Sequence, residues 1–340
     1  MRSAMKTLGA AAIVAVLLAV PATSGTALAG PVYDGKNVVL VVPNSPAGLM
    51  TQYARMIAPF IQKHSGAKLV RVENRTGAGG LKGTNTVWNE KPDGMTIAFT
   101  NVPALILAQL ADSPGVQFDA TKFTYLGRAA SEPRVLVVGT VSDIKTMEDI
   151  QKLGRPFAYA SQGTDEDFYA TSVVADVFGF NLKAITGYEG QSDTALAAIK
   201  GDLDGYTTGW VAAKPVVDAG EVRVIAVLDE KRLTDLPDVP SVVELATDDG
   251  KKGLLSATIT IMNMSRGFFG PPDMDPAATE EMRAAIEASL KDPELLAAAE
   301  KAGVSIIFAP GAEQQEKVSE VVAASEDLKS ILKASVSALQ

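Results

Sequence analysis

The sequence predicts an α/β fold in two lobes, each a mostly parallel sheet flanked by helices. Short apolar runs rich in β-branched residues alternate along the chain with amphipathic helical runs, which is typical of parallel strands covered by helices. The length of 340 residues and a hydrophobic content of 47% favour two domains. The order of the segments lets the chain build part of one lobe, cross to the second and return. Such a path leaves a cleft between the lobes, where small ligands bind.

The first predicted strand and the loop after it form the most informative segment. Residues 38–42 read Val-Val-Leu-Val-Val, which predicts a buried parallel strand. A polar loop with two prolines and Gly48 follows, and then an amphipathic helix is predicted over about 51–64. Such a loop aims the free backbone N–H groups of the helix N-terminus at one point, with the positive end of the helix dipole behind them. The segment therefore predicts a binding site for an anion.

The other predicted elements continue the alternation in chain order. Further strands are predicted at 68–72, 96–100, 125–130, 134–139, 157–161, 184–186, 205–208, 222–228 and 304–308. Further helices are predicted between the loop 73–80 and about residue 91, and at 104–111, 146–153, 167–178, 194–200, 276–290, 293–302 and 312–334. The segment 232–240, rich in Asp and Pro, is predicted as an ordered loop, and 248–252 as a charged turn before the uncharged run 254–264.

This order predicts a discontinuous first lobe. We expect residues 30–132 and 255–340 to form lobe 1 and residues 133–254 to form lobe 2. The lobes are expected to hinge at the two crossings, near 130–134 and 254–264.

The first 29 residues have the pattern of a signal peptide. Arg2 and Lys6 precede an uncharged apolar run at 8–20, and small residues at 27 and 29 form a cleavage signal. The alternative, a membrane anchor, needs about 20 apolar residues, and this run is shorter. We expect cleavage near Ala29 and a periplasmic protein.

The composition excludes several kinds of site. A net charge of −9 disfavours nucleic acid and anionic membrane surfaces as partners. With no cysteine and one histidine, the chain offers no Ser-His-Asp or Cys-His relay around a plausible nucleophile and no His-based metal site. That histidine, His64, is expected to end the first helix. The Gly-rich segment 77–84 fits neither nucleotide-binding template. We therefore expect no enzymatic activity, no metal and no cofactor.

Two features have more than one interpretation. Asp165, Glu166 and Asp167 follow the predicted loop 161–164, and acids at this place usually cap a helix. They could instead bind the ammonium group of a zwitterionic ligand, or a divalent cation carried with it. Trp210 follows a predicted strand, where it belongs either to the core or to a ligand pocket.

Several motifs occur together in an order that resembles a known family. They are Val41-Val42-Pro43 with Ala54-Arg55 beyond it, Glu73-Asn74-Arg75-Thr76-Gly77-Ala78-Gly79-Gly80 followed by Gly83, Pro92-Asp93-Gly94, Tyr159-Ala160-Ser161-Gln162-Gly163 and Leu236-Pro237-Asp238-Val239-Pro240. They span essentially the whole mature chain and resemble the substrate-binding proteins of tripartite tricarboxylate transporters, the Bug or TctC-like family. The resemblance implies a two-lobed periplasmic-binding-protein fold that closes around a small carboxylate in the interdomain cleft. It also implies that the protein presents this ligand to membrane permease subunits. We expect the protein to be a monomer.

The resemblance places the ligand contacts on two loops and on strand ends beside them. The predicted binding residues are Asn44, Ser45, Ala47, Gly48, Leu49, Met50 and Thr51 in the first loop, Thr100 and Asn101, Ser161, Gln162, Gly163 and Thr164 in the second loop, and Thr207, Thr208 and Trp210.

The chain departs from the family pattern in these places. Ala47 stands at a glycine position, Thr51 at an aspartate position, and Thr208-Gly209 where the family has Asp-Asn. The lost acids and the added apolar side chains favour a carboxylate with a hydrophobic or aromatic body over citrate or an amino acid. The acidic run after the second loop favours the opposite if it faces the ligand.

The predicted function is therefore capture of a small organic carboxylate in the periplasm and its delivery to a tripartite tricarboxylate-type transporter. A ligand-sensing adaptor for a receptor ectodomain would use the same pocket and is the alternative. An exported hydrolase is a third possibility, but it needs a nucleophile and a base that the sequence does not provide.

Overall fold

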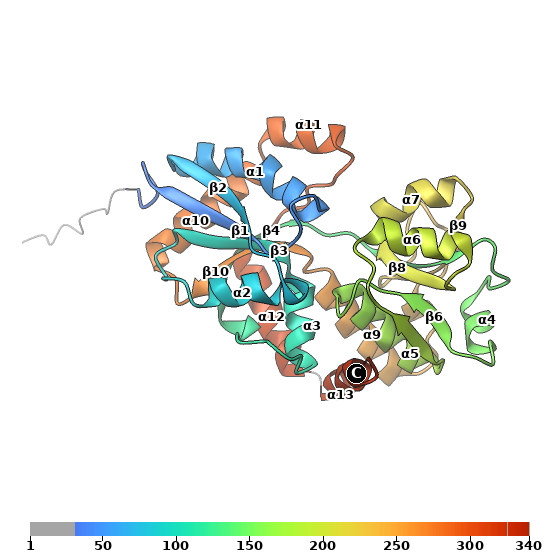
Figure 1. Cartoon of the computed structure of the whole chain (residues 1–340). Helices are drawn as coiled ribbons and strands as arrows, with labels where there is room; N and C mark the ends of the chain where they lie inside the picture. Colours follow the sequence, from blue (N-terminus) through green and yellow to red (C-terminus); the bar gives the residue numbers. More distant parts are fainter. Residues whose placement is uncertain (1–30, 325, 340) are drawn as a thin grey trace, which may run out of the picture. The chain divides into compact units, whose positions relative to one another are not determined.

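Two β-sheets carry the fold (Figure 1). The computed structural model describes residues 31–324 and 326–339. Within these residues the first sheet has six strands in the order β11-β4-β10-β3-β1-β2, which are β1 (Asn37–Val42), β2 (Leu69–Asn74), β3 (Thr96–Asn101), β4 (Phe123–Ala130), β10 (Arg266–Pro272) and β11 (Ala309–Pro310). The second has five in the order β7-β6-β8-β5-β9, which are β5 (Arg134–Gly139), β6 (Phe157–Ala160), β7 (Leu182–Ile185), β8 (Gly205–Gly209) and β9 (Val222–Leu228).

Most strands of each sheet run in one direction, and one central strand of each is reversed; in the first sheet the short edge strand β11, antiparallel to β4, is reversed as well. β1 pairs in parallel with β2 and β3, whereas β10 lies antiparallel between β3 and β4. In the second sheet β6 pairs in parallel with β7 and β8, whereas β5 lies antiparallel between β8 and β9. The two reversed central strands, β5 and β10, are the first strands that the chain forms after crossing from one sheet to the other. The predicted α/β class with two sheets is confirmed.

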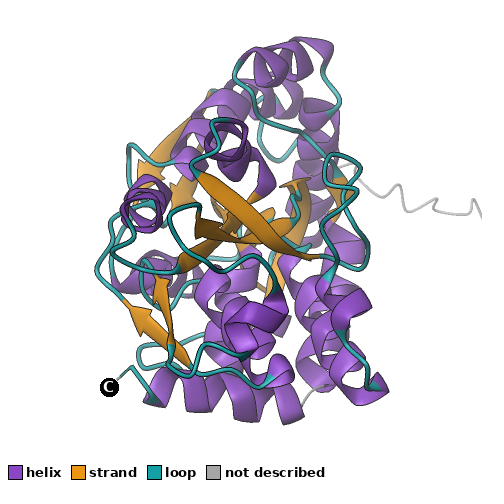
Figure 2. Ribbon diagram, turned by 90° about the vertical axis from the view of Figure 1, so that its right-hand side faces the viewer, coloured by secondary structure: helices purple, strands orange, loops and turns teal. Residues whose placement is uncertain are grey.

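Helices pack on both faces of the strands (Figure 2). On one face of the first sheet, α1 (Leu49–Ser65) and α10 (Pro276–Leu290) cover a core that includes Leu40, Ile57 and Phe268. Phe268 packs on Phe99 of β3 with ring centroids 4.4 Å apart. Phe269, next in β10, points to the other face and packs on Phe123 at 4.5 Å. Both faces of β10 are therefore buried.

The core on the other face continues into the second sheet. It passes through α3 (Val102–Leu110), α5 (Glu166–Phe178) and α9 (Asp249–Met262), and α13 (Glu326–Ser337) packs on both α3 and α5. The described residues form one compact unit. The predicted lobe boundaries and hinges stay predictions, although residues 254–262 of the second crossing are helical in α9 and only 263 and 264 lie outside the helix.

Most predicted elements are present, with ends shifted by a few residues. The remaining helices are η1 (Ala78–Gly80), α2 (Leu81–Trp88), η2 (Ala120–Lys122), α4 (Met147–Gln151), α6 (Gln191–Lys200), α7 (Trp210–Asp218), α8 (Val242–Leu245), α11 (Pro293–Lys301) and α12 (Gly311–Ala324). The sequence interpretation missed α7, α8 and α9. The predicted final helix is two helices, α12 and α13.

Two predictions are wrong. The strand at 304–308 is not formed, because only Ile307 N bonds toward the sheet, to Ala129 O at 2.7 Å, and ladder pairing begins at β11. The charged turn at 248–252 is the start of α9, where the Asp248 carboxylate accepts a hydrogen bond from Lys251 N at 2.9 Å. A side-chain cap, rather than a turn, accounts for the acids there.

The predicted signal peptide at 1–29 lies outside the described residues. Among the residues that the structure describes, no helix combines the length and the apolar character needed to cross a bilayer.

Candidate functional site

The loop between β1 and α1 ends in an uncapped helix N-terminus. Gly48 is the N-cap residue, α1 begins at Leu49, and no side chain caps the helix. The first turn contains no acidic residue. The amides of Leu49 and Met50 have no intrahelical acceptor because of their position. The loop thus presents free N–H donors and a positive dipole end, as an anion site requires.

Hydrogen bonds inside the loop fix its shape. The hydroxyl of Thr51, fully buried, donates to Ser45 O at 2.7 Å and accepts from Asn74 Nδ2 at 2.8 Å. Asn74 Nδ2 also donates to Asn44 O at 2.8 Å, and Thr100 Oγ1 donates to Asn44 Oδ1 at 3.1 Å. Thr51 therefore shapes the loop from within, and Ser45 remains exposed beside the helix N-terminus.

Replacing Asn74 with alanine is expected to destabilise the protein by about 1–2 kcal/mol, because it removes the donor that two acceptors of the loop, Asn44 O and Thr51 Oγ1, share. Urea denaturation measures the change. Asn89→Ala is the control, since the Asn89 amide donates to Asn85 O on the surface of α2. Equal losses in the two variants would contradict the role of Asn74.

The second predicted loop is also held from within. Ser161 is buried, and its hydroxyl donates to Gly163 O at 2.6 Å and accepts from Gly163 N at 3.1 Å. Gln162 and Thr164 are exposed. The Asp165 carboxylate then accepts from Phe168 N at 2.9 Å and caps α5. The helix-capping interpretation is therefore confirmed for Asp165.

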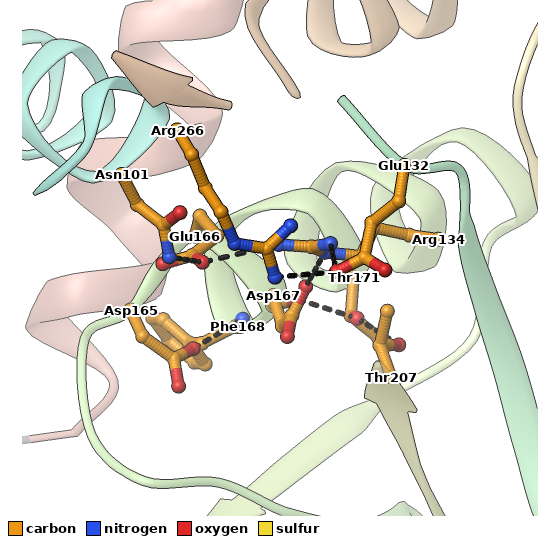
Figure 3. Close-up of polar contacts among 10 residues, drawn as sticks. All are labelled: Asn101, Glu132, Arg134, Asp165, Glu166, Asp167, Phe168, Thr171, Thr207 and Arg266. Atoms are coloured by element: carbon orange, nitrogen blue, oxygen red, sulfur yellow. Dashed lines mark hydrogen bonds and ion pairs between the residues drawn. The ribbon is translucent and has the colours of Figure 1, made fainter. Parts of the chain in front are cut away.

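Five buried charged side chains lie where the chain crosses between the sheets (Figure 3). This charge cluster consists of Glu132, Arg134, Glu166, Asp167 and Arg266. Arg134 uses all three nitrogens: Nε donates to Asp167 at 2.8 Å, Nη1 to Glu132 at 3.2 Å and Nη2 to Glu166 at 3.2 Å. Glu132 Oε1 also accepts from Arg266 Nη2 at 2.7 Å. No side chain of the cluster is more than 12% exposed.

Burial and charge pairing shift the pKa values in the cluster in opposite directions. Burial opposes the charge of Glu132, but the neighbouring Arg266 and Arg134 outweigh it and lower its pKa. Burial raises the pKa of Asp167 to about 7 despite the attraction of Arg134. The pKa of Asp165 is raised well above its usual value by burial and by repulsion from Asp167 and Glu166. The acidic run thus lies where burial and the neighbouring acids oppose further negative charge.

The cluster connects to the first loop along two paths. Asn101, at the end of β3, donates from Nδ2 to Glu166 Oε1 at 2.6 Å, and its neighbour Thr100 contacts the first loop. Arg266 also lies over the ring of Tyr53 in α1, with its guanidinium carbon 4.9 Å from the centroid. The predicted residues Thr100 and Asn101 thus join the two ends of the site.

Three predicted residues, Thr207, Thr208 and Trp210, belong to β8 and the start of α7. Thr207 shares a hydrogen bond of 2.7 Å with Thr171 under α5, and Thr208 alternates to the other face of β8. Trp210 opens α7, and its indole N–H donates to Asp235 at 3.1 Å. No hydrogen bond that the structure describes joins any of the three to the first loop.

Sequence reasoning missed Glu132, Arg134 and Arg266. Arg134 and Arg266 each open a strand that is otherwise apolar, so a charge at the start of a buried strand was the available signal. Among the described residues, no group of three or more acidic or histidine side chains is arranged to hold a metal ion.

Comparison with known proteins gives the family. Residues 53–334 match the family model of TctC, described as the tripartite tricarboxylate transporter family receptor. A UPF0065 protein from the tcbD-tcbE intergenic region of Pseudomonas sp. (strain P51) is 25% identical over 295 residues, covering 85% of this chain and 84% of that protein.

Solved structures show the same fold. The periplasmic binding protein BugD is 22% identical with a TM-score of 0.68, over 89% of this chain and 98% of BugD. Rpa4515 of R. palustris, solved with adipate, is 22% identical with a TM-score of 0.68, over 87% of this chain and 97% of that one. These matches confirm the predicted resemblance and the two-lobed fold class. The chain belongs to the tripartite tricarboxylate transporter receptor family, whose members are periplasmic solute-binding proteins and not enzymes.

Proposed function

We propose that this protein captures a small organic carboxylate in the periplasm and delivers it to the membrane permease of a tripartite tricarboxylate transporter. The observation that carries the proposal is the uncapped N-terminus of α1, with Gly48 as N-cap and no acid in the first turn. Adipate in the related Rpa4515 supports a carboxylate as the ligand class.

The proposed site holds the carboxylate with backbone donors. The free amides of Leu49 and Met50 donate to its oxygens, and such charge-assisted hydrogen bonds are about twice as strong as neutral ones. Four of the predicted binding residues in the two loops carry a hydroxyl, and those of Ser45 and Thr164 are on exposed residues. Those of Thr51 and Ser161 already bond within their loops. Leu49, 39% exposed, offers apolar contact to the body of the ligand.

A thermal-shift screen tests this function. Aliphatic dicarboxylates, aromatic carboxylates and amino acids are added to the full mature protein, and a true ligand at a hundred times its Kd stabilises the fold by about 2.7 kcal/mol. The function is wrong if no carboxylate raises the melting temperature.

Replacing Gly48 with valine is expected to abolish the ligand-induced shift and leave the fold intact. A Cβ at this position would lie 3.3 Å from Ser45 O, so the two added methyl groups must push into the loop or over the free amides. Valine is also a poor N-cap, which costs about 1 kcal/mol of stability. Circular dichroism checks the fold, and an unchanged shift would place the site elsewhere.

Delivery and export need separate tests. Uptake of the identified ligand by cells with and without the permease genes tests the transporter partner, and uptake that needs no permease would contradict it. The proposed cleavage near Ala29 is tested by N-terminal sequencing of the exported protein.

A further inference from the structure

We propose that the ligand carries one carboxylate and an ammonium group: the first loop holds the carboxylate, and the ammonium faces Glu166 and Asn101. This inference rests on the proposed function and narrows its ligand class. It excludes dicarboxylates, such as the adipate found with Rpa4515.

The two helix N-termini of the site differ in the charge they accept. At α1 there is no side-chain cap and no acid in the first turn. At α5 the Asp165 carboxylate occupies the cap position, and both Glu166 and Asp167 stand in the first turn, buried. These acids neutralise the dipole of α5 and repel an anion. One end of the site therefore accepts a carboxylate, and the other disfavours it.

The arginines do not offset this asymmetry. Arg134, whose side chain is only 4% exposed, already donates to three carboxylates of the cluster through Nε, Nη1 and Nη2, so its charge is shared among these acids. Arg266 lies against Tyr53 of α1, on the side of the first loop. The cluster as a whole has three carboxylates and two guanidiniums. Two of these three carboxylates, Glu166 and Asp167, stand in the first turn of α5, so the cluster offers an anion no net positive charge there.

Two buried atoms without a hydrogen-bond partner show the same difference between the two ends of the site, with a donor near α1 and an acceptor near α5. Arg266 has a side chain only 7% exposed, and its Nε has no hydrogen-bond partner. It is a donor next to α1, as an anion requires. Asn101 Oδ1 is also buried without a partner. Its identity as oxygen follows from chemistry, because the other amide atom must donate to the Glu166 carboxylate. It is an acceptor beside Glu166, as an ammonium requires (Figure 3).

The raised pKa of Asp167, about 7, agrees with this reading of the charges. Burial and the neighbouring Glu166 penalise its ionised form more than Arg134 favours it. A second carboxylate on the ligand would increase that penalty, and an ammonium would reduce it.

Matched ligands of equal chain length test the proposal on the full mature protein. Calorimetric titration compares 4-aminobutanoate with succinate and butanoate, and 6-aminohexanoate with adipate and hexanoate. The amino acid of at least one set is expected to bind about tenfold or more tightly than its two counterparts, since one favourable charge contact at this burial is worth about 1.4 kcal/mol or more. A dicarboxylate or an amine-free carboxylate that binds more tightly than the amino acid in both sets overturns the inference. Failure of every carboxylate, including those of the wider screen, overturns the proposed function instead.

Glu166→Gln supplies a second test that does not depend on the natural ligand. Glutamine keeps an acceptor for Asn101 and Arg134 and removes one negative charge, so the ratio of amino acid to dicarboxylate affinity is expected to fall about tenfold. Glu244→Gln is the matched control, because Glu244 also pairs with an arginine, Arg232 at 2.8 Å, but on the surface at α8. Urea denaturation confirms that both variants are folded. An unchanged ratio in the folded Glu166→Gln protein overturns the inference.

Discussion

Replacing Arg134 with methionine is expected to destabilise the protein by about 3–5 kcal/mol, which is a large part of the stability of an ordinary domain. The substitution removes the guanidinium that bonds the buried carboxylates of Glu132, Glu166 and Asp167. Glu132 keeps its ion pair with Arg266, whereas Glu166 and Asp167 lose their arginine partner. A buried charge without a partner costs far more than the pair contributed. Urea denaturation followed by circular dichroism measures the loss.

The control is Arg232→Met, which breaks a solvent-exposed pair with Glu244 and is expected to cost about 1 kcal/mol or less. The triple variant Arg134→Met, Glu166→Gln, Asp167→Asn removes the uncompensated acids as well, so it is expected to recover at least half of the loss. A single variant as stable as the control would mean that the cluster is not buried in solution.

The second large effect is expected from pH. The folded-state pKa of Asp167 is raised from 3.8 to about 7, and that of Asp165 is also raised. Between pH 3.8 and about 7 the folded state binds more protons than the unfolded state, so the free energy of unfolding falls as pH rises. The contribution is fully present below pH 3.8 and is lost as pH passes through about 7. We expect the free energy of unfolding to be about 2–4 kcal/mol larger at pH 5 than at pH 8.

Carboxylates with lowered pKa values limit the gain in stability at low pH. The pKa of Asp292 is lowered to about 2 by hydrogen bonds from Lys63 and His64, and that of Glu132 is lowered too. Their contribution is lost when pH falls below about 4.5. Asp167→Asn is expected to flatten the profile between pH 5 and 8. Melting curves across this range test both statements, and a wild-type profile that rises with pH would contradict them.

Local signals in the sequence predicted the fold well where they were strong. Helix α10 begins at Pro276, behind the capping residue Asp275, and ends at Leu290 as predicted. The apolar run of β1 was equally clear. The segment 304–308 has the alternation of a strand but lies against the edge with a single backbone bond. Because this segment does not form a strand, strand pairing here depends on a partner distant in the chain and not on the local pattern alone.

The candidate site likewise has a part that the sequence predicts and a part that it does not. Gly48 and the start of α1 could be predicted because strand, loop and helix are consecutive. The ion pair of Glu132 with Arg266 joins residues 134 positions apart, and no local pattern connects them. The acidic run was visible in the sequence, but its partner Arg134 was not, because a lone charge in an apolar strand has many possible roles.

The central place of β10 has a consequence for the order of folding. β10 is the strand that joins β3 to β4, so the first sheet cannot close until residue 272 is available. The second sheet is built from residues 134–228 alone. Closing a sheet with a strand from far along the chain is slow, because loop-closure entropy must be overcome before its contacts form. We expect β3 and β4 to remain open edges during this interval, exposed to aggregation, and the arrival of β10 to set the rate of folding.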